Sequence, residues 1–313
     1  MNVPSTSPTR LRQIALIAKD IARARYLLTT ILDTEVVYVD PDVSRWGIEN
    51  ILGGDIIEVC SPLKAGLHTP VGRQLAKRDI DAGGYMMIMQ TVDADARRRY
   101  IESHGLASVV FSHSHPGSGT ADNAIEPESV CIQYHPRGVP GGIMPELDSH
   151  ATTAQNPSPL AEYSPWHACG PGSYYPVYSA AMRRNSHLRL VGATLRLSPD
   201  HGVTTPHAAA RKWHDLFGIP YQDDELIFTN SRVRFLPASP GQPEGLESIT
   251  IQVTGKPRFD NLLKRVADEG LCGDGWTNML GVKWYFVLKD ESDSGSYSTT
   301  RQNSDPIKPS SKL

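Results

Sequence analysis

Short runs of apolar residues alternate with amphipathic stretches along most of this chain. The first run, 11–18, has the length and apolar character of a buried strand. Asp20 is then a predicted helix N-cap, ahead of apolar residues at helical spacing as far as Ile31. Three β-rich runs follow, at 35–39, 46–52 and 55–60. This pattern predicts the element order β-α-β-β-β.

The same order of elements is predicted three more times. In the first half it gives a strand at 84–92, a helix at 93–104, a short strand at 108–112 and a hairpin of 129–135 with 143–148. In the second half it gives a strand at 188–197, a helix at 205–217, a hairpin of 225–230 with 232–237, a strand at 246–253, a helix at 258–269 and a strand at 282–288. The sequence therefore predicts an α+β fold of four βαβββ units in two pairs, each pair with a curved mixed sheet and outer helices.

The composition between these units divides the chain. Residues 65–81 are predicted to form a loop. Residues 156–184 are rich in Pro, Gly, Ser and Tyr, but their aromatic side chains argue against disorder. The predicted organisation is a disordered tail (1–10), an N-terminal domain that carries the site (11–150), a linker or lid (151–187), a C-terminal domain (188–289) and a second disordered tail (290–313).

Length and charge narrow the classes of function. A chain of 313 residues with 39% hydrophobic content is long enough for two domains with ordinary cores. Its formal net charge of -3 predicts neither a nucleic-acid partner nor binding to an anionic membrane, and no apolar run has the length of a membrane-spanning helix. We expect a small-molecule partner, with a homodimer as one option for the assembly.

The four cysteines are predicted to be reduced thiols. Residues 1–10 lack the apolar core of a signal peptide, so the chain is expected in a reducing compartment. The cysteines are far apart and lack the spacing of a zinc site: Cys60, Cys131, Cys169 and Cys272.

The predicted hairpin at 131–148 combines polar side chains with a glycine-rich turn at 138–142. Strand residues alternate between faces, so one side of each arm carries a set of residues: Cys131, Gln133 and His135 on the first arm, and Met144, Glu146 and Asp148 on the second. A carboxylate and an imidazole are thus expected near the two ends of a turn whose glycines let a ligand approach the backbone. The alternative interpretation is a solvent-facing polar strand edge.

Paired βαβββ units resemble the vicinal oxygen chelate superfamily, which includes glyoxalase I, methylmalonyl-CoA epimerase, extradiol dioxygenases and bleomycin-resistance proteins. The stretches that carry this resemblance, and a further one to glyoxalase-like proteins, are 11–13, 13–20, 56–62, 83–86 and 131–148. The resemblance implies that each pair of units curls into a half-open β-sheet barrel. It indicates the fold more strongly than the reaction, because one fold hosts many chemistries.

The resemblance also implies a divalent metal ion held by one residue from each of four strands. The matching positions are Gln13, Glu58, Met87 and Glu146. The usual histidines are absent at Gln13 and Met87, and methionine is a soft ligand that suits an oxygen-rich site poorly. The cofactor is therefore left open between one divalent metal ion, bound by Glu58 and Glu146, and none.

Other histidines offer a displaced metal site. It could recruit His135, or His113 and His115, whose spacing puts both side chains on one face if their segment is a strand. For His113 and His115 a polar loop is the favoured interpretation. The second pair of units is interpreted as structural or substrate-covering, since its matching positions offer no ligand set: Gly192, Arg234, Ser248 and Lys283.

Without a standard metal, proton transfer by side chains is the chemistry that remains. Glu58, Glu146 and His135 are the predicted catalytic residues, because a buried carboxyl can have a raised pKa and imidazole titrates near neutral pH. Pairing of the units is expected to bring both glutamates onto one barrel wall. The residues predicted to contact the substrate are Gln13, Met87, Gln133 and Arg137, with Arg137 ranked ahead of Arg12 and Arg73 as the partner of a carboxylate or enolate.

Two classes of function fit these residues. The first is an isomerase or lyase that moves a proton next to the carbonyl of a small organic substrate, such as an aromatic, polyketide-like or acyl-CoA compound. The second is a metal-free small-molecule binding protein of the bleomycin-resistance type. Loss of two metal histidines favours binding, whereas retention of both glutamates favours catalysis, and the enzyme is the preferred interpretation.

The last three residues, Ser311, Lys312 and Leu313, match the tripeptide read by the peroxisomal import receptor. We therefore expect the protein in the peroxisomal matrix, and otherwise in the cytoplasm. Deleting Leu313 from a fluorescent fusion is expected to change a punctate distribution into a diffuse cytosolic one. Puncta that persist after the deletion would contradict this address.

Overall fold

The computed structural model describes residues 6–64, 68–77, 81–116, 127–154, 156–169, 172–199 and 202–290. The segment 291–313, which was expected to be a disordered tail ending in Ser-Lys-Leu, lies outside the described residues, as do residues 1–5. Thr9 and Arg10, which were expected to lie in a disordered tail, are held by the fold. The first strand begins at Arg10, and the buried Thr9 accepts a backbone hydrogen bond from Thr229 at 2.9 Å.

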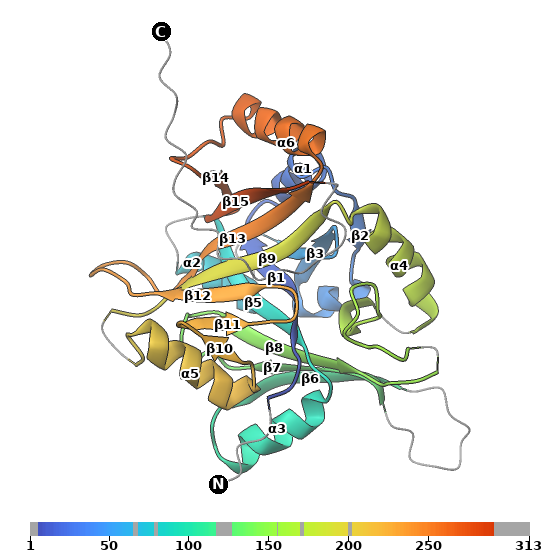
Figure 1. Cartoon of the computed structure of the whole chain (residues 1–313), viewed down its shortest axis with the longest axis vertical. Helices are drawn as coiled ribbons and strands as arrows, with labels where there is room; N and C mark the ends of the chain where they lie inside the picture. Colours follow the sequence, from blue (N-terminus) through green and yellow to red (C-terminus); the bar gives the residue numbers. More distant parts are fainter. Residues whose placement is uncertain are drawn as a thin grey trace.

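The first sheet has eight strands in the order β2-β3-β4-β1-β5-β8-β7-β6 (Figure 1). Its strands are β1 (Arg10–Ala18), β2 (Val36–Tyr38), β3 (Ile48–Gly53), β4 (Ile57–Pro62), β5 (Ala82–Gln90), β6 (Val109–Pro116), β7 (Pro127–Tyr134) and β8 (Met144–His150). The two units meet at the antiparallel pair β1 and β5, and each of these strands has a parallel partner, β4 or β8, on its other side. One sheet is therefore built from two βαβββ units.

The second sheet has seven strands in the order β10-β11-β12-β9-β13-β15-β14. Its strands are β9 (Leu188–Arg196), β10 (Tyr221–Gln222), β11 (Glu225–Ile227), β12 (Arg232–Leu236), β13 (Gly245–Thr254), β14 (Thr277–Met279) and β15 (Val282–Lys289). The same pairing recurs, with β9 and β13 antiparallel and with parallel partners β12 and β15 outside them. These two curled mixed sheets confirm the predicted α+β fold.

The helices begin and end at the signals that the sequence contains. They are α1 (Ile21–Tyr26), which continues as the π-helical turn Leu27–Ile31, α2 (Pro70–Ala76), α3 (Ala94–Ser103), α4 (Tyr175–Arg184), α5 (Pro206–Phe217) and α6 (Lys256–Asp268), with short 3-10 turns at Pro41–Trp46, His167–Cys169 and Gly172–Tyr174. The Asp20 carboxylate accepts a hydrogen bond from the N–H of Arg23 at 2.8 Å, which confirms the predicted cap. Gly218 ends α5 in the left-handed conformation, with φ of 71°.

The two sheets share one hydrophobic core. A single cluster of buried side chains includes Leu16 and Met87 of the first sheet and Leu190 and Ile251 of the second. Helices α1 and α6 lie together at one end of the molecule, and α3 and α5 lie at the other (Figure 1). In the middle, a Cβ added at Gly84 of β5 would lie only 2.4 Å from that of Leu246 in β13. The absence of a side chain there lets the two sheets approach each other closely.

Three predicted loops contain regular structure. Residues 70–76 form α2, whose start is capped by Thr69 through a hydrogen bond from the N–H of Gly72 at 2.9 Å. Residues 175–184 form α4, which buries Tyr178, Ala181 and Met182. The strand predicted at 108–112 continues to residue 116, so the interpretation of the histidine segment as a polar loop is wrong. In these segments, packing against the rest of the chain outweighs a composition typical of loops.

The segment predicted to be a linker or lid covers part of the first sheet on the face opposite α1 and α3, whereas α2 packs on the same face through Val71 and Leu75. We call residues 156–169 and 172–184 the cover segment. Three of its side chains, Trp166, Tyr178 and Met182, pack on the sheet against Ala15, Leu52, Met86 and Ile88. The cover segment therefore fills the hollow of the first half-barrel.

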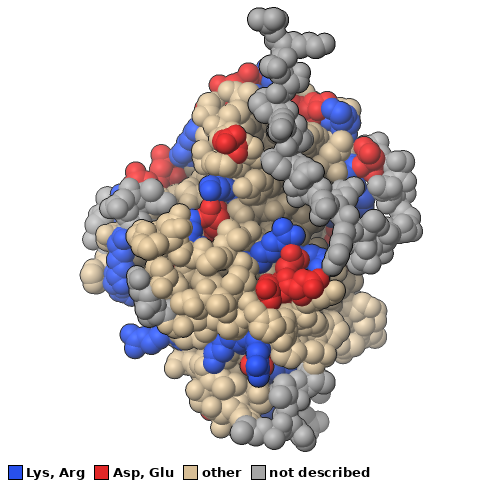
Figure 2. Space-filling view, turned by 60° about the vertical axis from the view of Figure 1, so that its left-hand side comes forward, with Lys and Arg blue, Asp and Glu red and all other residues tan. Residues whose placement is uncertain are grey.

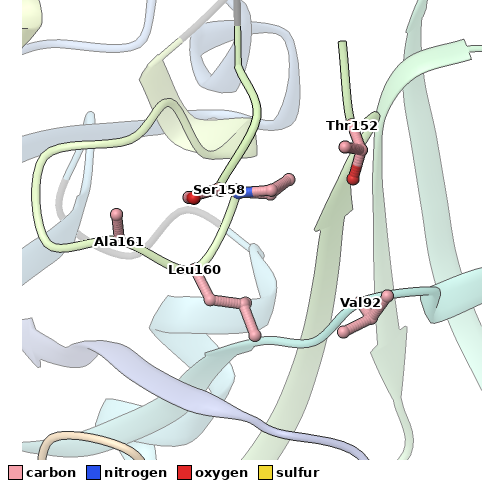
Figure 3. A pocket seen from close by; sticks show the side chains of 6 residues that line it. Val92, Thr152, Ser158, Leu160 and Ala161 are labelled. Carbon is pink, nitrogen blue, oxygen red and sulfur yellow. The ribbon is translucent and has the colours of Figure 1, made fainter.

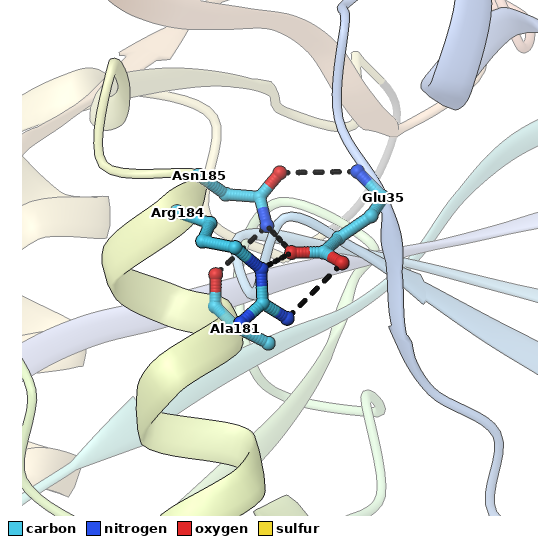
Figure 4. Close-up of polar contacts among 4 residues, drawn as sticks. All are labelled: Glu35, Ala181, Arg184 and Asn185. Atoms are coloured by element: carbon cyan, nitrogen blue, oxygen red, sulfur yellow. Dashed lines mark hydrogen bonds and ion pairs between the residues drawn. The ribbon is translucent and has the colours of Figure 1, made fainter.

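The end of α4 is tied to the first unit by polar contacts around Glu35 (Figure 4). Arg184 donates to both carboxylate oxygens of Glu35, at 2.8 and 3.2 Å. The N–H of Glu35 donates to Oδ1 of Asn185 at 3.0 Å, and the Asn185 amide donates to the carbonyl of Ala181 at 2.8 Å. Arg184 and Glu35 are 59% and 42% exposed, so their ion pair stabilises little. Its main effect is to define where α4 ends.

Charges of both signs lie next to each other on the face shown in Figure 2. This mixture agrees with 31 basic and 34 acidic residues in the sequence. Within the described residues, no helix has both the length and the apolar character needed to span a membrane.

Candidate functional site

Glu58 and Glu146 lie on the face of the first sheet that the cover segment fills. Ala15 pairs with Glu58 on one side and with Met86 on the other, while Ile88 pairs with Glu146. Paired residues share a face, and residues two apart in a strand share it too. The two glutamates, one from each unit, therefore point into the same half-barrel.

Glu58 is held by groups of its own unit. Nδ2 of Asn50 donates to Oε1 of Glu58 at 2.7 Å, and the thiol of Cys60 lies 3.5 Å from the same oxygen. The Asn50 amide is oriented in turn, because its Oδ1 accepts the N–H of Asp40 at 2.9 Å. Burial raises the pKa of Glu58, and the hydrogen bonds from Asn50 and Cys60 partly oppose this.

Glu146 has the same kind of environment in the second unit. Nε2 of Gln133 donates to Oε2 of Glu146 at 2.6 Å, and the thiol of Cys131 is a second hydrogen-bond partner. Burial raises the pKa of Glu146 to about 7; the bond from Gln133 opposes the rise, and the charge of Glu58 adds to it. Each unit thus supplies a buried carboxyl held by an amide and a thiol.

Asp148 adds a third buried carboxyl to this face. It is fully buried, and among the described residues neither of its oxygens has a hydrogen-bond partner. One ligand atom each from Asp148, Glu146 and Cys131 lie within 4.8 Å of one another. Burial, and then repulsion from Glu146, raises the pKa of Asp148 well above its usual value. Two carboxyls this close disfavour having both in the charged form at once.

Of the predicted substrate contacts, Gln13 and Gln133 lie on this face and Met87 does not. Gln13 precedes Ala15 by two residues, and its Oε1 is buried without a partner among the described residues. Met87 pairs with Ile14 and belongs to the core under the helices. The predicted role of Met87 is therefore corrected, because its side chain points to the other side of the sheet.

The structure does not bring His135 and Arg137 to the carboxyls. Both are exposed beyond the end of β7, where the N–H of Arg137 donates to Nδ1 of His135 at 2.9 Å. His135 was placed on the face of Gln133 because side chains alternate along a strand, but β7 ends at Tyr134, one residue before His135. The polar strand edge that was the alternative interpretation describes these two residues, although it does not describe the buried Glu146.

Arg12 contacts the cover segment and does not reach an open pocket. Its guanidinium is buried and donates to Oε1 of Gln90 at 2.6 Å. It also donates to backbone carbonyls of the cover segment, at Glu162 (3.0 Å), Ala161 (3.1 Å), Pro159 (3.4 Å) and Ser164 (3.4 Å). Arg12 thereby fastens the start of the cover segment to β1.

The metal site implied by the superfamily does not fit these residues. On the covered face, β1 and the two glutamate strands supply the amide of Gln13 and the carboxyls of Glu58 and Glu146. The fourth strand, β5, supplies the apolar side chains of Met86 and Ile88 there. Two carboxyls and a neutral amide, with hydrocarbon and a thioether at the fourth position, make a poor cage for a hard divalent ion.

A cluster of histidines lies at the edge of the same sheet face. His113 and His115 extend from β6, and His167 belongs to the cover segment. Nδ1 of His113 lies 3.0 Å from Nε2 of His167, and Ser129 Oγ lies 3.0 Å from Nδ1 of His167. Only the spacing of His113 and His115 was visible in the sequence. His167 is 54 residues away from His113, in a segment without a period.

The cavities lie beside the cover segment. One of about 310 Å³ is bounded by Val92, Thr152 and residues 158–161 (Figure 3). A neighbouring one of about 410 Å³ is lined by polar residues that include Asp93, Arg99 and His150. Neither of these two cavities is lined by Glu58 or Glu146, and both glutamates are buried.

Comparison with known proteins bears on the fold. No family model and no curated protein matches the sequence. Among solved structures, a hypothetical protein from Staphylococcus aureus aligns with 90% of this chain and 100% of its own, at 11% identity and a TM-score of 0.52. Methylmalonyl-CoA epimerase from Mycobacterium tuberculosis aligns with 48% of this chain and 93% of its own, at 23% identity and a TM-score of 0.35. A methylmalonyl-CoA epimerase in complex with methylmalonyl-CoA and NH4+ aligns with 46% of this chain and 96% of its own, at 22% identity and a TM-score of 0.34. The first similarity concerns the fold alone, and the two epimerase scores are too low to carry an argument.

Proposed function

We propose that the protein is an enzyme of isomerase or lyase type, which transfers a proton next to the carbonyl group of a small organic substrate. The observation that carries this proposal is the pair Glu58 and Glu146. Each is buried on one sheet face and is held by an amide and a thiol of its own unit. A buried and oriented carboxyl with a raised pKa is the kind of group that general acid-base catalysis requires.

In this proposal Glu146 is the group that changes protonation state. With a pKa of about 7 it is charged in part of the molecules and protonated in the rest at neutral pH. In its charged form it removes the proton from the carbon next to the carbonyl. The resulting enolate is protonated at carbon, by Glu58 on the other side for an isomerase, or loses a leaving group for a lyase. Gln13 supplies an amide for the substrate oxygen.

The cover segment has a role in the same reaction. Its apolar side chains Trp166, Tyr178 and Met182 exclude water from the carboxyls, which keeps the pKa of Glu146 high. Water exclusion also protects an enolate from unwanted protonation. The substrate replaces these side chains over the sheet, so opening of the cover segment precedes binding.

The test is an exchange assay in deuterated water. Carbonyl compounds of several classes, with acyl-CoA thioesters, aromatic ketones and polyketide-like diketones among them, are incubated with the protein and followed by mass spectrometry. A substrate gains deuterium next to its carbonyl. For that substrate, Glu146→Gln is expected to lower the exchange rate by roughly a hundredfold or more, because the shape stays and the proton carrier is lost.

Glu102→Gln is the matched control. Glu102 is an exposed glutamate on α3 that pairs with Arg98, so its replacement is expected to leave exchange unchanged. If a substrate is found and both Glu58→Gln and Glu146→Gln exchange it at the normal rate, the site assignment is wrong.

The second candidate is a small-molecule binding protein. It is favoured by the aromatic side chains that gather on the covered face, where Tyr178 contacts the rings of both Tyr38 and Trp166. For a binding protein, an aromatic ligand is expected to quench the tryptophan fluorescence of the protein, and the ligand is expected to gain no deuterium. Ligand affinity that is the same in Glu146→Gln would favour this candidate over the enzyme.

A further inference from the structure

We propose that His113, His115 and His167 bind a divalent transition-metal ion, of the zinc, cobalt, nickel or copper class, and that the bound ion fastens the cover segment to the edge strand β6. The site is distinct from the four-strand metal position of the superfamily. It lies on β6 and the 3-10 turn His167–Cys169, which supply none of the residues at that position.

The three imidazoles converge as metal ligands do. One ligand nitrogen from each ring lies within 4.8 Å of the others. The ring centroid of His113 is 5.0 Å from that of His115 and 5.1 Å from that of His167, and the centroids of His115 and His167 are 4.4 Å apart. Zinc binds imidazole nitrogens at about 2.0–2.1 Å, so small rotations of the side chains bring all three nitrogens onto one ion.

Ser129 orients the ring of His167 for this role. Its Oγ lies 3.0 Å from Nδ1, so that Nε2 is the nitrogen that faces His113. A metal-bound histidine usually uses one ring nitrogen for the ion and the other for such a hydrogen bond. Ser129 itself is placed by pairing with His115, because the two residues are opposite each other in β6 and β7.

The type of ligand selects the class of ion. Neutral imidazole suits zinc, copper, nickel and cobalt, whereas magnesium and calcium take oxygen ligands. The side chains of all three histidines are half-buried, so one side of the cluster is accessible to solvent. Three protein ligands with an accessible side leave a position for water, as in many zinc sites with three histidines.

The three ligands come from two parts of the fold, so a bound ion links these parts. Two ligands belong to the edge strand of the first sheet, and the third belongs to the cover segment, one residue after Trp166. An ion that holds all three links the cover segment to the sheet beside the buried carboxyls. Removal of the ion therefore frees this part of the cover segment, whatever the protein does with a substrate.

The test uses the full-length protein without a histidine tag, freed of metal by a chelator and dialysis. Zinc is titrated by calorimetry, and cobalt is followed by its visible absorption. One ion per chain is expected, with the spectrum of a site that has nitrogen ligands. His113→Ala and His167→Ala are expected to abolish this stoichiometric binding, and Ser129→Ala is expected to weaken it roughly tenfold to a hundredfold.

Two controls separate this site from other parts of the protein. His135→Ala removes an exposed histidine just beyond the end of β7 and is expected to bind the ion normally. Glu146→Gln removes one of the buried acidic groups and is also expected to bind normally, which makes the result independent of the proposed reaction. If an alanine variant does not fold, His115→Gln and His167→Gln are used instead, because glutamine keeps part of the side-chain volume of histidine.

Hydrogen exchange measures the link to the cover segment. Zinc is expected to slow amide exchange at residues 163–169 in the unmodified protein and not in His167→Ala. The proposal is overturned if the folded unmodified protein binds no zinc or cobalt stoichiometrically. It is also overturned if binding survives the loss of His167, or if it is lost in Glu146→Gln and retained in the histidine variants.

Discussion

The unmodified protein is expected to become less stable as the pH rises from about 4.5 to about 7, and Glu146→Gln is expected to lack this decrease. The pKa of Glu146 is raised from 4.5 in the unfolded chain to about 7 in the folded protein. Between these values the folded state binds more protons than the unfolded state, so the free energy of unfolding falls as the pH rises. A shift of this size corresponds to a stability loss on the order of 3 kcal/mol above pH 7.

The measurement is urea unfolding of both proteins at several pH values from 4.5 to 8. Other groups titrate in this range, and burial lowers the pKa of His150 to about 4, which gives a slope of opposite sign below its ordinary value of 6.5. The difference between the variant and the unmodified protein reports the contribution of Glu146 together with its repulsion of Asp148. Glu102→Gln is expected to follow the unmodified protein at every pH. Equal pH slopes for Glu146→Gln and the unmodified protein would show that Glu146 does not titrate as described.

Replacing Arg12 by methionine is expected to lower the free energy of unfolding by roughly 3 kcal/mol or more. The variant keeps the aliphatic part of the side chain and loses the buried hydrogen bonds to Gln90 and to the cover segment. The buried Oε1 of Gln90 then loses its charged donor, and an unsatisfied buried acceptor costs about 1–3 kcal/mol. The part-buried bonds to the carbonyls of Ala161 and Glu162 are lost as well. The loss is concentrated at the cover segment, because that is where the guanidinium donates.

Hydrogen exchange at residues 159–164, read together with chemical denaturation, tests this prediction. Faster exchange there, with little change in α5 or α6, is expected for Arg12→Met. Arg12→Lys is expected to be intermediate, since a single ammonium group cannot reproduce the planar fork of donors. Arg211→Met, a change of an exposed arginine on α5, is the control and should remain within about 0.5 kcal/mol of the unmodified protein. Normal stability and normal exchange in Arg12→Met would mean that Arg12 does not hold the cover segment.

Local signals in the sequence account for most of the elements. Asp20 caps α1 where it was expected to, Thr205 caps α5 at the start of the helix predicted at 205–217, and Gly218 ends α5, because capping depends on a few neighbouring residues. The sequence also placed Gln133 and Glu146 on the two arms of one hairpin, and the structure pairs these two residues. The order of these elements was enough to predict paired curled sheets.

Only the tertiary structure decided which side chains of β5 point toward the cover segment and which point into the core. Its run from Met86 to Met89 is apolar at every position, so alternation could not tell which residues face the cover segment. An irregular register between Ala15 and Leu16 of β1 also shifts the pairing of β5. For this reason Met87, predicted to contact the substrate, packs in the core instead.

The cover segment shows the same limit at a larger scale. Its sequence shows no hydrophobic periodicity, and the contacts of Trp166 and His167 are with strands that are far away in the chain. The sequence by itself determined the order of the four repeated units, of which the fourth is shorter by one strand (β13, α6, β14 and β15), and the placement of a carboxyl in each of the first two. Both follow from alternation, caps and turns, which act over a few residues. The tertiary structure alone decided that Arg12 holds a cover over these carboxyls and that three histidines meet at the sheet edge, because such contacts depend on how the curled sheet brings distant segments together.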